Sequence, residues 1–469
     1  MMSSYYSLNC PMGMENPGNF CYLISVIQTL LRCKSIVKFI KKNDKMDKIF
    51  NLVFNLEDTI RATIYTKDEM KQHMDRVKYI IENAEGEDKD KLMQYLKDNE
   101  VTKEELLKAI ELFSNNISQI YIYIYFIKCL KALQMMNQTK HSPKEIFKMR
   151  KNINKVVMDF IKVNNIVLDN MGLGELCNNQ QNDAVEYLLT LIDILNDSHG
   201  IPCPVKPENI LRPDELSLTE EQLDKEEFAK RVLIGYKKAY WDMNKKSFTT
   251  LKNDMYLYTL QKIYCQHCKY NSLSFDHTNM LNLSIPSRKN NKEAIEKAMS
   301  QHSSHIMKMI HSRYGHTINA DEEEDEENCL SLYSCLDAYF YTEVMDFDYK
   351  CSSCKVTSKY NLLSKSMLNL PTNIIISLKR FYFEPTMGQM AKNCEKILYP
   401  EILDLRNYYA MKVENDSKET LYHLVGVICH TGSLGMGHYY CYSLIHNEEL
   451  IYDEMLDKVP FDVRQQKIW

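Results

Sequence analysis

Two residues near opposite ends of the chain, Cys21 and His438, could together hydrolyse an acyl bond. A cysteine thiolate is a nucleophile, and a histidine can take the thiol proton and later return it to the leaving amine. Each residue stands in a segment suited to that chemistry. The fold must therefore bring the two ends of the chain together.

The segment around Cys21 predicts a helix that begins at the thiol. Cys21 follows a loop rich in Gly, Pro and Asn (13–19) and precedes apolar residues at helical spacing, namely Leu23, Ile27, Leu30 and Leu31. Free backbone N–H groups and the positive end of the helix dipole favour a thiolate there. The other segment predicts two strands, 424–432 and 435–442, joined by a glycine-rich turn, with His438 at the start of the second.

Two Cys-x-x-Cys pairs predict a metal site. Their members are Cys265, Cys268, Cys351 and Cys354. Each pair can place two thiolates on one ion, and four thiolates make a tetrahedral zinc site that is structural, because no position stays open for a reactive water. The alternative is four unrelated buried thiols, since a long segment separates the pairs.

Four segments of the chain resemble the ubiquitin-specific proteases, the papain-like deubiquitinating cysteine peptidases. The segment 16–28 resembles their cysteine box, and 426–442 resembles their histidine box. Gln-Gln-Asn-Asp at 180–183 resembles their Gln-Gln-Asp box, and 370–381 resembles their Leu-Pro and Leu-Lys-Arg-Phe region. The boxes stand in the order found in the family, and the resemblance covers roughly 10–40 and 115–460.

The resemblance implies an α+β papain-like fold of the ubiquitin-specific type, with one catalytic domain over 10–469. A helical lobe would carry Cys21, and a β lobe would carry His438 and Asp453. The cysteine pairs would lie at the tips of the strands of a "fingers" sheet. Two insertions fall outside the resemblance. The first (about 41–111) is polar, is almost free of Gly and Pro, and predicts helices. The second (about 287–328) contains seven consecutive acids and predicts a disordered loop between finger strands.

The resemblance also implies roles for individual residues. Asp453 would orient the imidazole of His438, with its neighbour Glu454 as the rival. Asn16 would stabilise the oxyanion, although Asn before Pro-Gly is also a common turn residue. Contacts with the substrate are implied for Asp183, Gln181 and Tyr439. Asp183 has the alternative role of a helix N-cap.

The implied reaction is hydrolysis of the isopeptide or peptide bond after the C-terminal glycine of ubiquitin, through a thioester on Cys21. A ubiquitin-like modifier as substrate is one alternative, and a catalytically weak ubiquitin-binding scaffold is another. A zinc-ribbon nucleic-acid binder would need a basic face, which the composition does not show. Ubiquitin and ubiquitinated proteins are therefore the expected partners, without nucleic acid or membrane, and zinc is the only expected cofactor.

Composition agrees with a protein of the cytoplasm or nucleus. The 469 residues are 45% hydrophobic and 26% charged, and the net charge is −5. The N-terminal residues do not resemble a secretory signal, and no apolar run is long enough to span a bilayer. We therefore expect the 15 cysteines to be mostly reduced thiols. The chain ends at Trp469, shortly after Asp453, where the family normally continues; we expect a shortened lineage or a truncated sequence.

Overall fold

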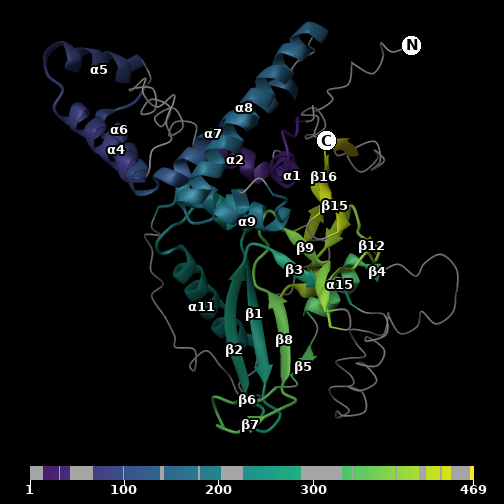
Figure 1. Ribbon diagram of the computed structural model, residues 1–469. Helices are drawn as coiled ribbons and strands as arrows, with labels where there is room; N and C mark the ends of the chain where they lie inside the picture. Colours follow the sequence, from purple (N-terminus) through teal and green to yellow (C-terminus); the bar gives the residue numbers. More distant parts are fainter. Residues whose placement is uncertain are drawn as a thin grey trace. The chain divides into compact units, whose positions relative to one another are not determined.

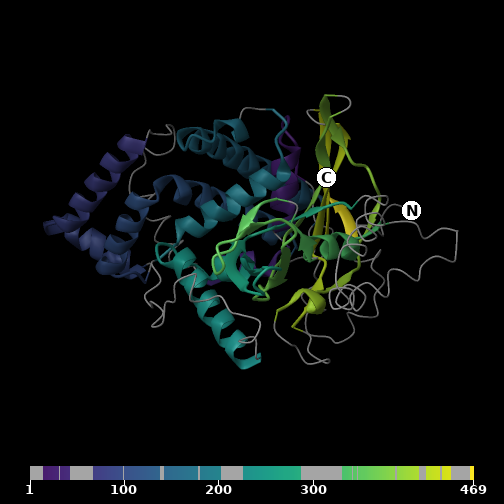
Figure 2. The same ribbon diagram turned by 90° about the horizontal axis from the view of Figure 1, so that it is seen from below.

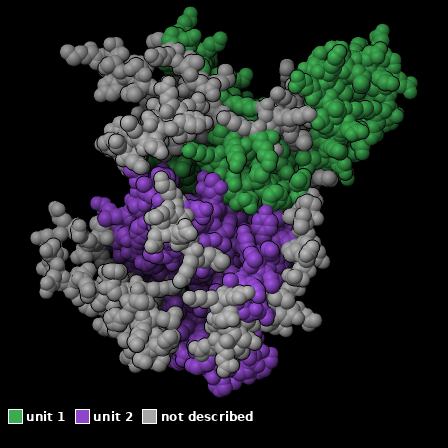
Figure 3. All heavy atoms as spheres, turned by 180° about the vertical axis from the view of Figure 1, so that it is seen from behind, with its two compact units in different colours: residues 1–203, 246–254, 425–469 green, residues 204–245, 255–424 purple. Residues whose placement is uncertain are grey.

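The computed structural model divides the chain into two compact units, coloured separately in Figure 3. Unit 1 comprises Met1–Cys203, Lys246–Asp254 and Val425–Trp469, and unit 2 comprises Pro204–Lys245 and Met255–Leu424. The structure describes residues 14–30, 32–42, 67–98, 100–137, 142–177, 180–201, 225–286, 330–340, 342–345, 347–385, 388–410, 419–433, 436–444 and 465–468.

The core of unit 1 is helical. Its helices are α1 (Cys21–Leu30), α2 (Lys34–Lys42), α7 (Ile117–Asn137), α8 (Pro143–Asn170), the 3-10 turn η3 (Gly174–Cys177), α9 (Ala184–Ser198) and most of α12 (Thr250–Met255). Helices α7 and α8 lie side by side (Figures 1 and 2). Helix α8 begins with a capping box, in which Ser142 Oγ accepts from Glu145 N (3.4 Å) and Glu145 Oε2 accepts from Ser142 N (2.8 Å).

The first insertion forms the helices α4 (Lys67–Glu82), α5 (Gly86–Asp98) and α6 (Lys103–Asn115). Helix α4 packs against α6 and α7, and buries Met74, Val77 and Ile81, which recur at helical spacing. The remaining side chains of α4 for which burial is described are exposed. The predicted helices with polar outer faces are therefore present over 67–111, while 43–66 lies outside the described residues.

The histidine segment forms the predicted hairpin. Strand β15 (Gly426–Ser433) pairs antiparallel with β16 (Met436–Leu444), which also pairs with β17 (Gln465–Ile468). This hairpin packs on α1 and belongs to the same compact unit. The expected arrangement, with Cys21 on a helix and His438 on paired strands, is therefore present. Gly426 explains part of the close approach, because a Cβ there would lie 2.8 Å from Thr29 Cγ2 on α1.

Unit 2 contains a four-stranded sheet in the order β2-β1-β8-β5. Its strands are β1 (Leu257–Tyr264), β2 (Asn271–Thr278), β8 (Leu362–Met367) and β5 (Glu343–Val344). Helix α11 (Lys225–Asn244) packs on β1 and β2 (Figure 1). Val232 on α11 shares one apolar cluster with Tyr258, Leu260 and Leu273 of the sheet.

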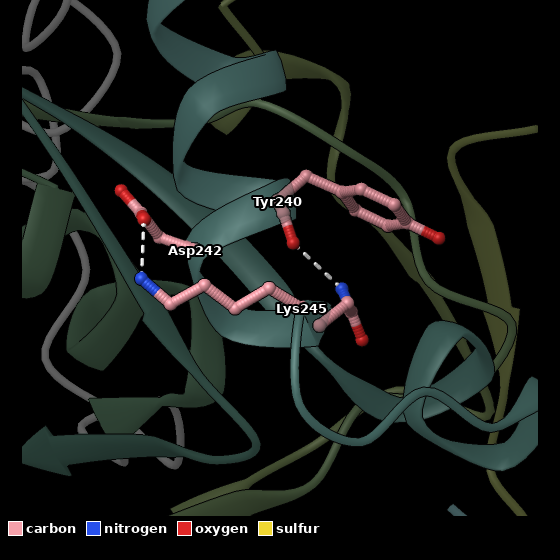
Figure 4. Close-up of polar contacts among 4 residues, drawn as sticks. Tyr240, Asp242 and Lys245 are labelled. Atoms are coloured by element: carbon pink, nitrogen blue, oxygen red, sulfur yellow. Dashed lines mark hydrogen bonds and ion pairs between the residues drawn. The ribbon is translucent and has the colours of Figure 1, made fainter. Parts of the chain in front are cut away.

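The C-terminal end of α11 is held by local contacts, drawn in Figure 4. Asn244 Nδ2 donates to the carbonyl oxygen of Tyr240 (2.8 Å), and Lys245 Nζ lies 2.9 Å from a carboxylate oxygen of Asp242. The Lys245 ammonium also lies 5.0 Å from the centroid of the Trp241 ring. These contacts satisfy groups at a helix end and close the element before the chain turns.

The rest of unit 2 contains helix α15 (Leu332–Phe340) and five pairs of short strands. The pairs are β3 (Leu281–Ser284) with β9 (Ile376–Lys379), β4 (Leu330–Ser331) with β12 (Ile397–Leu398), β6 (Tyr349–Lys350) with β7 (Thr357–Ser358), β10 (Phe381–Glu384) with β11 (Gln389–Lys392), and β13 (Ile402–Asp404) with β14 (Leu421–His423). Leu283 of β3, Leu336 of α15 and Leu403 of β13 lie in one apolar core.

The second insertion connects β3 to β4, and both strands pair outside the four-stranded sheet. Its expected position between finger strands stays a prediction. The acidic residues of 287–328 lie outside the described residues. Among the described helices, none is both long and apolar enough to cross a membrane.

Candidate active site and cysteine cluster

Cys21 is the first residue of α1, as predicted. The carbonyl oxygen of Phe20 accepts the first helical hydrogen bond, from Ile24 N (3.0 Å), so Phe20 caps the helix and Cys21 occupies its first turn. The thiol is buried. Its Sγ accepts a hydrogen bond from the backbone N–H of Tyr439 at 3.5 Å. Cys21, at the N-terminus of a helix, is thus joined directly to the strand that carries His438.

Asn16 organises the loop that precedes α1. Its Oδ1 accepts from the backbone N–H groups of Gly18 and Phe20, each at 3.2 Å. Two N–H donors identify that end of the amide as the oxygen. The turn contacts expected of an ordinary Asn are therefore present, and they leave the NH2 end as the part that could donate to an oxyanion.

His438 is the third residue of β16, pairs with Thr431 across the hairpin, and is exposed. Both residues that flank it are bound to the helical part of unit 1. On one side, Tyr439 donates to Cys21. On the other side, Gly437 N donates to Gln181 Oε1 (2.7 Å), and Gln181 Nε2 donates to the Gly437 carbonyl oxygen.

The three predicted substrate residues gather beside Cys21, at the N-terminus of α9. Asp183 caps this helix, because its Oδ1 accepts from Val185 N at 2.6 Å. The Tyr439 hydroxyl is hydrogen-bonded by the backbone of Ala184. Burial, and then the charge of Asp183, raises the pKa of Tyr439 to about 12, so the phenol stays neutral at physiological pH. Gln181 lies just before the cap.

Sequence reasoning did not assign any function to Gly437 or Asn182. A Cβ at Gly437 would lie 2.2 Å from His430 Nε2 and 2.4 Å from the Thr431 carbonyl oxygen, so only glycine fits. Asn182 Nδ2 donates to the hydroxyl of Tyr22 (3.2 Å), a buried residue that directly follows Cys21 in the chain. For Gly437, the sequence did contain a signal, namely a glycine directly before His438. Asp453 and Glu454 lie outside the described residues, so the third member of the triad stays a prediction.

The two Cys-x-x-Cys pairs converge in unit 2. The sulfur atoms of Cys265, Cys268, Cys351 and Cys354 all lie within 4.8 Å of one another. Cys265 Sγ is 4.0 Å from Cys354 Sγ, and Cys268 Sγ is 3.7 Å from Cys351 Sγ. Tetrahedral zinc with bonds of about 2.3 Å needs sulfurs about 3.8 Å apart, so the cluster fits a metal ion.

The two pairs also share a backbone conformation. Cys265 N donates to the Tyr270 carbonyl, and Lys269 N donates to the Cys265 carbonyl; Cys351 and Lys355 repeat this pattern with Val356. Lys269 (φ 61°) and Lys355 (φ 60°) are left-handed. Each loop therefore folds back on its first cysteine and directs both thiols to one point. The four cysteines of the cluster are free thiols.

Comparison with known proteins gives the family. The model of the ubiquitin carboxyl-terminal hydrolase family matches residues 12–466. The chain belongs to the ubiquitin carboxyl-terminal hydrolase family. It is 36% identical over 122 residues to a probable ubiquitin carboxyl-terminal hydrolase of Acanthamoeba polyphaga mimivirus (25% of each chain). It is 30% identical over 128 residues to ubiquitin carboxyl-terminal hydrolase 8 of Saccharomyces cerevisiae (26% of this chain, 27% of that one).

The fold of this hydrolase-family chain is also found among solved structures. The SAGA Ubp8/Sgf11/Sus1/Sgf73 DUB module bound to ubiquitin aldehyde matches with a TM-score of 0.50 and 15% identity, over 95% of this chain and 65% of that chain. The matched regions span about a quarter of the curated relatives and about two thirds of the solved chain. The resemblance and the α+β fold predicted from the sequence are confirmed.

Proposed function

We propose that this chain is a deubiquitinating cysteine protease that hydrolyses the isopeptide or peptide bond after the C-terminal glycine of ubiquitin. The observation that carries the proposal is the hydrogen bond from Tyr439 N to Cys21 Sγ, which joins the cysteine box to the histidine box within one unit. Membership of the family supports the same activity.

In this mechanism, His438 takes the proton from Cys21, and the thiolate attacks the carbonyl carbon of the scissile bond. The resulting tetrahedral oxyanion accepts hydrogen bonds from the Cys21 backbone N–H and the Asn16 amide. His438 then returns the proton to the leaving amine, and water hydrolyses the thioester. Asp453 holds the imidazole in the productive orientation and favours its cationic form.

The metal proposed for the four-cysteine cluster is zinc. Four thiolates saturate a tetrahedral ion, so its contribution is to fold the end of the sheet rather than to activate water. The sulfur separations of 3.7 and 4.0 Å support this choice. The sheet capped in this way would hold the globular body of ubiquitin.

The proposed partners are ubiquitin and ubiquitinated proteins, and the proposed location is the cytoplasm or nucleus. Bound ubiquitin aldehyde in a structure of the same fold supports the choice of partner. The protease differs from a ubiquitin-binding scaffold in its need for Cys21 and His438, and the two can be separated by experiment.

The test uses ubiquitin with a fluorogenic C-terminal amide, and Cys21→Ala as the matched variant. We expect wild type to release the fluorophore. The variant should lose all cleavage but bind ubiquitin nearly as tightly as wild type, because the thiol does chemistry while the rest of the surface supplies affinity. Turnover by a clean Cys21→Ala preparation would refute the assignment. Cleavage of a ubiquitin-like modifier in place of ubiquitin would keep the protease assignment and change its substrate.

A further inference from the structure

The side chain of Gln181 binds both polar groups of one residue, Gly437. Its Oε1 accepts the Gly437 N–H at 2.7 Å, and its Nε2 donates to the Gly437 carbonyl oxygen. A planar amide that both donates to and accepts from one residue fixes its position and its orientation together, as a residue pair in an antiparallel ladder does. The next residue along the chain is His438.

Gln181 is itself attached to the helix of the nucleophile. It lies two residues before Asp183, the N-cap of α9, and α9 packs on α1. Asn182 Nδ2 donates to the Tyr22 hydroxyl (3.2 Å), and the Tyr22 ring meets the edge of Tyr187 on α9 with centroids 5.5 Å apart. Tyr22 directly follows Cys21. The backbone at Gln181 is therefore fixed relative to the buried turn of α1 that carries the thiol.

The opposite side of Gly437 is closed by the hairpin. His430 Nε2 would lie 2.2 Å from a Cβ at Gly437, and the His430 ring packs on Tyr439 with centroids 4.6 Å apart. Gly437 is thus held between Gln181 and its partner strand. Beyond His438, Tyr439 is held by Cys21 Sγ and by the backbone of Ala184.

We infer that Gln181 is a positioning residue, which holds Gly437 so that the backbone of His438 is clamped on both sides relative to Cys21. This inference rests on the proposed function. It gives Gln181 a role different from the substrate contact predicted by the sequence, because its Oε1 and Nε2 both already bind Gly437. Displacing a catalytic base by about 1 Å can cost about 10²-fold in rate, so the clamp acts on catalysis rather than on affinity.

The test compares Gln181→Ala and Gln181→Glu with the control Gln94→Ala. Gln94 lies on α5, where its Nε2 donates to Asp98 Oδ1 (2.7 Å). The glutamate keeps the size and one acceptor, but replaces the donor that faces the Gly437 carbonyl. We expect both Gln181 variants to lower kcat on the fluorogenic ubiquitin substrate by about 10-fold to 100-fold, with KM within about threefold of wild type. Gln94→Ala should behave as wild type.

A second readout does not involve ubiquitin. The rate at which iodoacetamide alkylates Cys21 depends on the thiolate that His438 supports, so both Gln181 variants should react several-fold more slowly than wild type. Mass spectrometry of the Cys21 peptide measures this rate, and circular dichroism checks folding. If wild type proves inactive on ubiquitin, the proposed function fails, while the alkylation rates still decide the clamp.

Two results would overturn the inference. A raised KM with unchanged kcat and unchanged alkylation would make Gln181 a substrate contact. A lower melting temperature, with kcat per folded molecule and alkylation both equal to wild type, would make it a structural residue only. Reduced kcat together with slower alkylation, in folded protein, supports the clamp.

Discussion

The amide of Asn16 has two ends, and the structure assigns only one of them. The oxygen accepts from Gly18 and Phe20, and so holds the turn. The NH2 end is the part that could stabilise an oxyanion. Asn16→Asp therefore separates the two roles better than Asn16→Ala does, because a carboxylate keeps the acceptor and loses the donor.

If the amide donates to the oxyanion, Asn16→Ala and Asn16→Asp should both lower kcat by about 10²-fold to 10³-fold with little change in KM. If Asn16 only holds the turn, Asn16→Ala should cost about 1 kcal/mol of stability, and Asn16→Asp should keep both stability and activity. Measuring kcat, KM and the thermal midpoint on the same preparations decides between them. A folded Asn16→Asp enzyme with kcat within about threefold of wild type would contradict the catalytic role.

Asp183 allows a similar separation. It caps α9 through Val185 N (2.6 Å), so Asp183→Ala should lower the free energy of unfolding by about 0.5–2 kcal/mol. Asparagine is an equally good N-cap, so Asp183→Asn should keep stability. If the carboxylate also contacts the ubiquitin tail, Asp183→Asn should raise KM for the fluorogenic ubiquitin substrate. Denaturant unfolding and steady-state kinetics measure the two effects, and an unchanged KM would leave Asp183 with the cap alone.

The residues that come together at the site were easier to predict from the sequence than the hydrogen bonds between them. Cys21 and His438 stand in local patterns that identify them, and Asp183 is a recognisable cap. The contact of Gln181 with Gly437 could not be predicted, because it joins residues 256 positions apart and depends on the packing of α9 and the hairpin against α1. Asn16 was predicted in part: a turn was expected there, but not that Gly18 N and Phe20 N donate to its side chain.

At the scale of elements, the cysteine loops give the most direct prediction. We expect one zinc per chain, bound by the four cysteines, and each Cys→Ser change should lower the zinc content and destabilise the adjacent strands, because metal binding is coupled to folding. Elemental analysis of purified protein tests this, with Cys394→Ser as the control at an exposed cysteine outside the cluster. Stoichiometric zinc after removal of both Cys351 and Cys354 would place the metal elsewhere.

Elements with a clear hydrophobic period could be predicted from the sequence, and the contacts through which they pack could not. Helix α1 and the hairpin β15–β16 follow from hydrophobic spacing and turn residues. The packing of the hairpin on α1 could not be predicted, because it depends on tertiary detail such as the close approach of Gly426 to Thr29. The pairing of β3 with β9 and of β4 with β12 could not be predicted either, since pairing between strands far apart in the sequence has no local signal.

At the scale of the whole molecule, we expect the free energy of unfolding to depend on pH through His199. Burial lowers its pKa from 6.5 to about 3, and its ring packs between Phe39 and Tyr123. The unfolded chain binds the proton more readily, so the stability contributed by neutral His199 is complete above pH 6.5 and declines as the pH falls towards 3. From pH 7 to pH 5 the loss should be about 2 kcal/mol.

Denaturant unfolding at the two pH values measures this loss. His199→Phe keeps an aromatic ring between Phe39 and Tyr123 and cannot be protonated, so about 2 kcal/mol of the difference between pH 7 and pH 5 should disappear in the variant. Equal pH dependence in wild type and variant would mean that other groups are responsible.

The central claim, that Cys21 is the nucleophile of a ubiquitin-directed protease, is tested most directly by ubiquitin bearing a C-terminal electrophile. Wild type should form one covalent adduct per chain, and peptide mapping should place it on Cys21 rather than on another of the 15 cysteines. Cys21→Ala should form none. Folded wild type that forms no adduct, or forms one that maps to a different cysteine, would contradict the account.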